Sequence, residues 1–185
     1  TSNLHKSGTD RCFEALKKIN DNFDIVINIQ GDEPFVQPEQ IETLKLCFSD
    51  PKTEIATLIK PFDKNISWDE LSSPNTPKVV INNRMEALFF SRSIIPYLRG
   101  VDRTKWLKKH TFYKHIGMYA YKVDTLSKIT ELKQSELEKS EKLEQLRWLE
   151  NGYSIKVGIT HIETIGIDTP EDLEKANQIF NNKNI

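Results

Sequence analysis

Two acidic residues directly after an apolar run are the first candidates for chemistry. Asp32 and Glu33 follow a stretch rich in Ile and Val (25–29) and a glycine, Gly31. Such a run is typical of a strand buried on both faces, and ligands of open α/β sheets bind beyond the carboxyl ends of the strands. The two carboxylates therefore stand where a metal ion or a phosphate would be handled. Glycine, aspartate and proline are also ordinary turn residues, so this stretch alone favours a site and a simple turn about equally.

A capped helix is expected near the start of the chain. Ser7 or Thr9 can cap a helix whose apolar residues recur at helical spacing between positions 12 and 19. A helix N-terminus attracts anions, so a nucleotide contact is possible here. A capped surface helix explains the same residues, and the sequence alone favours that explanation modestly.

An arginine and a histidine belong to later strands. Arg92 directly follows an apolar strand, and arginine suits bidentate capture of a carboxylate or a phosphate, although a surface arginine at a strand end is the commoner case. Residues 115–121 alternate in polarity, which places His115 and Tyr119 on one face of a strand. A single histidine is more often structural, but this pair is suggestive of a ligand-binding face.

Three further polar positions lie on or before helices. Glu144 and Gln145 occupy the more polar side of an expected helix (141–150), and composition alone gives no reason to reject a solvated helix face. Asp168 precedes a capping box that begins a terminal helix. It is either a turn residue or a second carboxylate directed at the crevice beyond the strands.

The elements that must position these residues alternate between strands and helices. Two strands separated by a short turn predict a hairpin over residues 78–92. Runs of β-branched and aromatic residues predict strands, and helical spacing predicts the segments between them. The expected strands are 25–29, 55–59, 78–82, 87–92, 115–121 and 154–159, and the expected helices are the capped one that includes residues 12–19, then 38–48, 124–132, 141–150 and 170–180.

Composition argues against several classes of protein. Lys plus Arg number 26 against 27 for Asp plus Glu, so a net charge of −1 gives no electrostatic footprint for nucleic acid. Cys12 and Cys47 are too far apart for a zinc or redox pair, which favours a reducing compartment and a cytoplasmic protein. No apolar stretch approaches the ~18 residues of a membrane span. P-loop, dinucleotide-binding and hydrolase motifs are absent from the sequence. A single domain that binds a small charged ligand fits best.

Six motifs, taken together and in this order, resemble the CMP-Kdo synthetases. These are the 3-deoxy-manno-octulosonate cytidylyltransferases of lipopolysaccharide biosynthesis, and the likeness extends over essentially the whole chain. The set is far more specific than any of its members. The motifs are residues 7–11, 30–34, 90–92, 115–119, 143–147 and 166–173.

The resemblance implies a fold, a reaction and a cation. The implied fold is a Rossmann-like nucleotidyltransferase, a three-layer α/β/α arrangement with a mixed, mostly parallel sheet and an inserted hairpin and dimerisation region. The implied reaction converts CTP and Kdo into CMP-Kdo and pyrophosphate with Mg²⁺. The implied protein is a cytoplasmic homodimer that needs neither nucleic acid nor a membrane.

The resemblance also assigns roles to the candidate residues. The two acids after strands become catalytic metal ligands, the segment before the first helix becomes part of the nucleotide site, and the remaining polar residues surround the sugar acid. The metal ligands are Asp32 and Asp168; the nucleotide residues are Ser7, Gly8, Thr9, Arg11 and Asp32; the sugar residues are Gln30, Arg92, His115, Tyr119, Glu144 and Gln145.

One departure from the family concerns the start of the chain. The family opens with a strand and a basic, glycine-containing loop around the triphosphate, and no such segment precedes Thr1. Because a strand-loop-helix-strand unit takes ~30 residues, we expect residues 1–185 to be a single nucleotidyltransferase domain without its first strand-loop-helix unit, and to be inactive alone. Two rival interpretations remain. One is a CMP-sialic acid synthetase, although the residues assigned to the sugar favour Kdo. The other is a remnant that binds a nucleotide or a sugar but does not catalyse the reaction.

Overall fold

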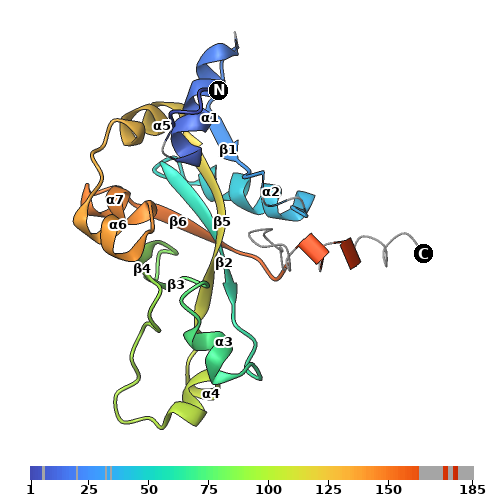
Figure 1. The fold of residues 1–185 in the computed structure, drawn as a ribbon, viewed down its shortest axis with the longest axis vertical. Coiled ribbons are helices and arrows are strands. Elements are labelled where there is room, and N and C mark those ends of the chain that lie inside the picture. Colours follow the sequence, from blue (N-terminus) through green and yellow to red (C-terminus); the bar gives the residue numbers. More distant parts are fainter. Residues whose placement is uncertain are drawn as a thin grey trace.

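The structure, a computed structural model, describes residues 1–5, 7–19, 21–31, 33, 35–162, 173–174 and 177–178 (Figure 1). The helices in these ranges are α1 (Gly8–Lys18), α2 (Pro38–Leu46), α3 (Trp68–Ser72), α4 (Trp106–Lys109), α5 (Val123–Thr130), α6 (Glu136–Glu141) and α7 (Gln145–Glu150), with short 3-10 turns η1 (Cys47–Ser49) and η2 (Arg103–Lys105). The strands are β1 (Ile25–Asn28), β2 (Ile55–Pro61), β3 (Lys78–Ile81), β4 (Ala87–Ser91), β5 (Tyr113–Lys122) and β6 (Ile155–Ile159).

The strands form one mixed sheet around β5. Its order is β4-β3-β5-β2-β6, and β1 also pairs with β5. In the part of the chain that the structure describes, only β2 and β6 pair in parallel, while β5 pairs antiparallel with β1, β2 and β3, and β3 with β4. The prediction of a mostly parallel sheet is therefore wrong. Helices cover both faces of this sheet, so its strands are as apolar as parallel ones, and apolar runs do not reveal strand direction.

Helices lie on both faces of the sheet, so the predicted three-layer α/β/α arrangement is confirmed. One face packs against α1, α5 and α7 in a core that includes Tyr119, Tyr121 and Trp148. The other face packs against α2 and η1 through Ile116, Met118 and other residues. The predicted alternation along β5 is thereby confirmed, with aromatic side chains toward one layer and aliphatic ones toward the other.

A smaller core lies toward the end of the molecule that carries α3 and α4 (Figure 1). Trp106 is buried there and stacks on Phe112 with ring centroids 6.0 Å apart, and Trp68 meets its edge at 5.5 Å. The hairpin predicted over residues 78–92 leads into this region, and β3 and β4 pair antiparallel as expected. The region is therefore anchored by aromatic packing of its own.

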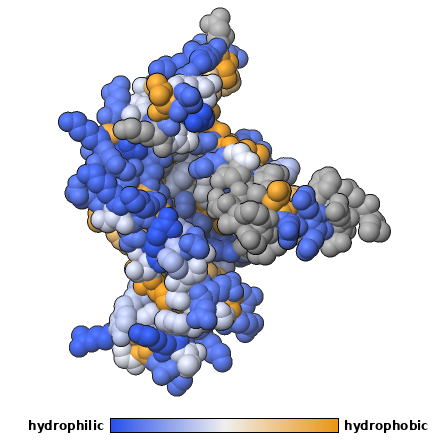
Figure 2. Space-filling view, viewed as in Figure 1, coloured by the Kyte–Doolittle hydropathy of each residue, from blue (hydrophilic) through white to orange (hydrophobic). Residues whose placement is uncertain are grey.

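Hydrophilic side chains dominate the face of the molecule shown in Figure 2, where hydrophobic areas are small and separate. Of the helices that the structure describes, none has the length and hydrophobicity needed to cross a membrane.

Candidate functional site

The N-terminus of α1 is built as the sequence predicts. Ser7 is the N-cap, since its hydroxyl accepts a hydrogen bond from the backbone N–H of Asp10 at 3.2 Å. The sequence left Ser7 and Thr9 open for this role. Thr9 points inward instead: it is 3% exposed and its hydroxyl donates to Oε2 of Glu144 at 2.9 Å. The first turn of α1 is thereby tied to the start of α7.

A hollow of about 590 Å³ lies between α1 and the end of β1. Its lining includes Gly8 and Arg11, which were predicted to contact the nucleotide, and Gln30, which was predicted to contact the sugar. The guanidinium of Arg11 donates to the backbone oxygen of Ser2 at 3.1 Å. This volume is within the range of small-molecule sites, so the hollow can receive a ligand beside the capped helix end.

Four predicted sugar residues meet on the sheet face that α1 and α7 cover. The rings of His115 and Tyr119 lie 5.3 Å apart on β5, and Trp148 of α7 meets the edge of Tyr119 at 5.0 Å. Glu144 and Gln145 stand at the beginning of α7, the second of them buried. The structure thus brings together residues from two elements that are distant in sequence.

The carboxylate of Glu144 is held from two sides. Thr9 donates to one oxygen, and Arg147 donates to the other at 2.6 Å. Arg147 is itself buried, donates to the backbone oxygen of Leu132 at 2.9 Å and lies 3.3 Å from Glu138. Burial raises the pKa of Glu144 above its ordinary value, and the contacts with Thr9 and Arg147 oppose that rise.

His115 is partly buried against other rings and one hydroxyl. Its Nε2 lies 3.0 Å from Oγ1 of Thr57, and the ring of Phe90 meets it edge-on at 5.1 Å. Removal from water lowers the pKa of His115 to about 3. The imidazole is therefore neutral at physiological pH.

Two buried donors around this cluster have no hydrogen-bond partner within the described residues. They are Nε2 of Gln145 and Nε1 of Trp148, whereas the hydroxyl of Tyr119 lies beside Thr57 and that of Tyr121 beside Thr9. Buried polar groups are usually satisfied, so these two donors are available to a ligand or to water. Burial also raises the pKa of both tyrosines, which keeps their hydroxyls protonated as donors.

Arg92 sits beside the link between α6 and α7. Its guanidinium donates to the backbone oxygens of Glu141 at 2.6 Å, Pro74 at 2.7 Å and Lys142 at 3.3 Å. It follows Phe90, whose ring contacts His115, by two residues. Three of its five N–H groups thus make structural contacts, and a ligand would use the other two.

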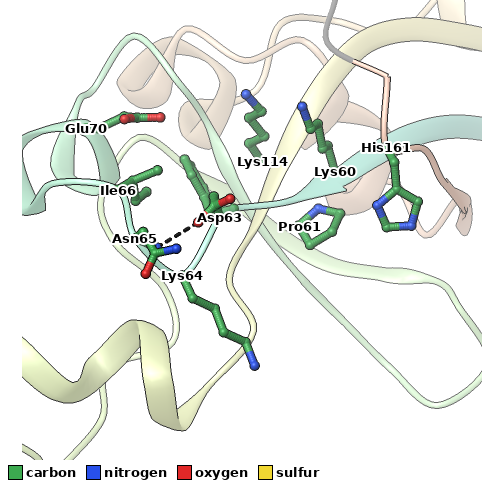
Figure 3. A pocket seen from close by; sticks show the side chains of 10 residues that line it. Lys60, Pro61, Asp63, Lys64, Asn65, Ile66, Glu70, Lys114 and His161 are labelled. Carbon is green, nitrogen blue, oxygen red and sulfur yellow. Dashed lines mark hydrogen bonds between the residues drawn. The ribbon is translucent and has the colours of Figure 1, made fainter.

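A second hollow of about 600 Å³, drawn in Figure 3, includes Lys60, Lys114 and His161 in its lining. Lys60 and Lys114 are paired across β2 and β5. Because successive side chains of a strand point to opposite faces, Lys114 lies on the opposite face of the sheet from His115. This hollow is therefore separate from the cluster of predicted sugar residues.

Sequence reasoning missed four residues of the cluster. Thr57, Tyr121, Arg147 and Trp148 all contact or adjoin predicted site residues, yet the sequence presents them as strand or helix core. Arg147 lies within one of the six motifs, and a basic residue three positions after Glu144 at helical spacing was the available signal. The others carry no signal that distinguishes them from ordinary core residues.

The predicted metal ligands Asp32 and Asp168 lie outside the described residues, so their proximity stays a prediction. Among the residues that are described, no group of three or more His, Cys, Asp or Glu side chains gathers as a metal site.

Helices lie on both faces of a mixed sheet, and polar residues of separate elements converge on one of these faces, an arrangement that suits a nucleotidyltransferase of the α/β type. The chain belongs to the cytidylyltransferase family, whose sequence pattern matches residues 1–162.

Within that family, this chain is similar to several 3-deoxy-manno-octulosonate cytidylyltransferases. The protein of that name from Parabacteroides distasonis is 63% identical over 177 residues, which are 95% of this chain and 70% of that protein. The one from Bacteroides thetaiotaomicron is 60% identical over 183 residues, or 99% of this chain and 73% of that protein. A solved CMP:2-keto-3-deoxy-manno-octonic acid synthetase complexed with CTP matches with a TM-score of 0.86 and 40% identity, covering 99% of this chain and 71% of that one. The resemblance to the CMP-Kdo synthetases is therefore confirmed.

Proposed function

We propose that this chain carries the sugar site and part of the nucleotide site of an enzyme that transfers CMP from CTP to Kdo. The anomeric hydroxyl oxygen of Kdo bonds to the α-phosphorus of CTP, and the bond from that phosphorus to the bridging oxygen breaks. Pyrophosphate leaves with that oxygen, and the hydroxyl proton passes to solvent. The observation that carries the proposal is the convergence of His115, Tyr119, Glu144 and Gln145, with the buried amide of Gln145 unpaired among the described residues.

The chemistry of these side chains suits an acidic sugar with several hydroxyls. A carboxylate such as Glu144 accepts hydrogen bonds from hydroxyls, whereas the buried Gln145 amide can donate to sugar oxygens. The free N–H groups of Arg92 would bind the sugar carboxylate. On the other side of α1, the hollow lined by Gly8 and Arg11 would receive the nucleotide, near a helix N-terminus that favours anions.

The proposal includes Mg²⁺ held by Asp32 and Asp168. Carboxylate oxygens are the ligands that Mg²⁺ prefers, and a bound ion would neutralise charge on the phosphate oxygens. Exchanging either aspartate for asparagine removes the charge but keeps the shape. Asp32→Asn should therefore reduce Mg²⁺-dependent turnover on the order of 100-fold or more, since a metal ion contributes several kcal/mol, with little effect on stability. Near-normal turnover of Asp32→Asn would contradict the role of Asp32 as a metal ligand.

The deciding experiment mixes the full-length protein with CTP, Mg²⁺ and one acidic keto sugar. Pyrophosphate release and a CMP-sugar product are expected with Kdo, and neither with sialic acid. Turnover with sialic acid would favour the rival CMP-sialic acid synthetase. Binding of either substrate without release of pyrophosphate would favour a non-catalytic remnant.

We also propose a cytoplasmic homodimer. The two described cysteines, Cys12 and Cys47, are unpaired, in keeping with a reducing compartment. In the region from the hairpin to α7, Leu88 is 59% exposed and Tyr97 is 72% exposed, which favours contact with a second copy. Cell fractionation would test the location, since recovery of the protein outside the cytoplasmic fraction would contradict it.

A further inference from the structure

Thr57 is fully buried in the middle of β2, at an irregularity in its pairing with β5. It pairs with Tyr119, but the next residue, Leu58, pairs with Ile116. Two residues of β5, Gly117 and Met118, are therefore left without a partner on β2. Because the shift is by two positions, the alternation of faces is preserved and His115 stays on the same face as Tyr119.

Besides the hydroxyl of Tyr119, which can donate to it, three groups surround the hydroxyl oxygen of Thr57. The backbone oxygen of Met118 lies at 2.8 Å, the backbone oxygen of Ile116 at 3.3 Å and Nε2 of His115 at 3.0 Å. Carbonyl oxygens can only accept hydrogen bonds, and a threonine hydroxyl has a single proton to donate. The proton therefore goes to a carbonyl, and the nearer one belongs to Met118.

This arrangement determines what His115 must do. With its proton donated to Met118, the Thr57 oxygen faces Nε2 with a lone pair, so a contact of 3.0 Å is favourable only if Nε2 carries a hydrogen. The imidazole is neutral, because burial keeps its pKa far below physiological pH. In a neutral imidazole only one nitrogen is protonated, so Nδ1 is left as an acceptor. Within the described residues Nδ1 makes no hydrogen bond, and the side chain is not completely buried.

We propose that Thr57 is a positioning residue that fixes His115 as the Nε2–H tautomer, so that Nδ1 accepts a hydrogen bond from a hydroxyl group of the sugar. Tautomer choice through the second ring nitrogen is a general way of setting the role of a histidine. The sugar carboxylate is consequently bound by other groups, since an acceptor nitrogen repels it. The second half of this proposal rests on the proposed function, whereas the tautomer does not.

The tautomer can be read directly by nuclear magnetic resonance of protein labelled with ¹⁵N-histidine at pH 7.5. We expect the His115 proton on Nε2, protected from exchange with solvent, in the wild type and in Thr57→Ser, which keeps the hydroxyl. Thr57→Val keeps the branched shape but removes the acceptor, so protection of this proton should be lost. A wild-type proton on Nδ1, or unchanged protection in Thr57→Val, would overturn the proposal. If Thr57→Val does not fold, the wild-type and Thr57→Ser spectra still decide the tautomer.

Kinetics of the full-length protein test the second half. Thr57→Val should raise the KM for Kdo roughly 3- to 10-fold, the range for one misplaced neutral hydrogen bond, and leave the KM for CTP almost unchanged. In Thr57→Ser, which keeps the hydroxyl, the KM for Kdo should stay close to the wild-type value. If the spectra are as expected but the KM for Kdo is unchanged in Thr57→Val, the proposed tautomer is supported and the proposed contact with the sugar is wrong. Absence of wild-type turnover with Kdo would instead refute the proposed function.

Discussion

At the scale of single residues, Arg92 combines a structural role with a proposed binding role. Its three contacts with backbone oxygens link the loop before β3 to the turn between α6 and α7. Arg92→Ala should lower the free energy of unfolding by roughly 2–3 kcal/mol, since each such bond contributes about 1 kcal/mol. It should also raise the KM for Kdo more than the KM for CTP. Urea unfolding and steady-state kinetics would measure the two effects, with exposed Arg99→Ala as control. If stability falls while both KM values stay unchanged, Arg92 has a structural role and does not bind the sugar.

The partly buried imidazole of His115 predicts a dependence of stability on pH. Its folded pKa of about 3 lies below the unfolded value of ~6.5, so between these values the unfolded state binds more protons. Its contribution to stability is thus complete above ~6.5 and lost as pH falls toward 3. Between pH 7.5 and 5.5 the loss should be ~1.4 kcal/mol. Urea unfolding of His115→Gln should lack this component of the pH dependence. Equal dependence in wild type and variant would contradict it.

At the scale of elements, Arg147 connects α6, α7 and the end of α5. It lies between Glu144 and Glu138 and also donates to the backbone oxygen of Leu132. Arg147→Met should cost roughly 3 kcal/mol, because removal of one partner leaves partly buried carboxylates unpaired. Adding Glu138→Gln should recover part of that loss, and urea unfolding of the two single variants and the double variant would measure the coupling. Strictly additive effects would show that the Arg147–Glu138 pair is not energetically coupled.

At the scale of the whole molecule, the proposed dimer predicts a specific sensitivity to surface changes. The wild type should sediment as a dimer at micromolar concentration. Leu88→Lys combined with Tyr97→Ser should shift it to monomer, because charge and lost apolar area oppose burial of that surface. Leu46→Lys is a matched control, since Leu46 is 69% exposed on α2, outside this region. A wild-type monomer, or dissociation by the control alone, would contradict the dimer.

The order of the strands and the family were determined by the sequence, whereas the expected helix over residues 141–150 is in fact the end of α6 followed by α7. Apolar runs and helical spacing predicted the strands of the described sheet and the hairpin at residues 78–92, because burial imposes a period on each element. Six motifs in a fixed order led to the cytidylyltransferases, as the similarity over residues 1–162 confirms. The motif residues His115, Tyr119, Glu144 and Gln145 could be named as candidates before any fold was known.

Only the tertiary structure decided strand direction and the environment of each candidate. The described sheet is mostly antiparallel because β5 runs opposite to its three neighbours β1, β2 and β3, and periodicity along one strand contains no information about the direction of the next. Thr57 becomes relevant because strand pairing brings it to His115, across 58 positions. Hydrogen bonds and desolvation depend on groups that meet in space, so the neutral state of His115 and its proposed tautomer could only come from the folded chain.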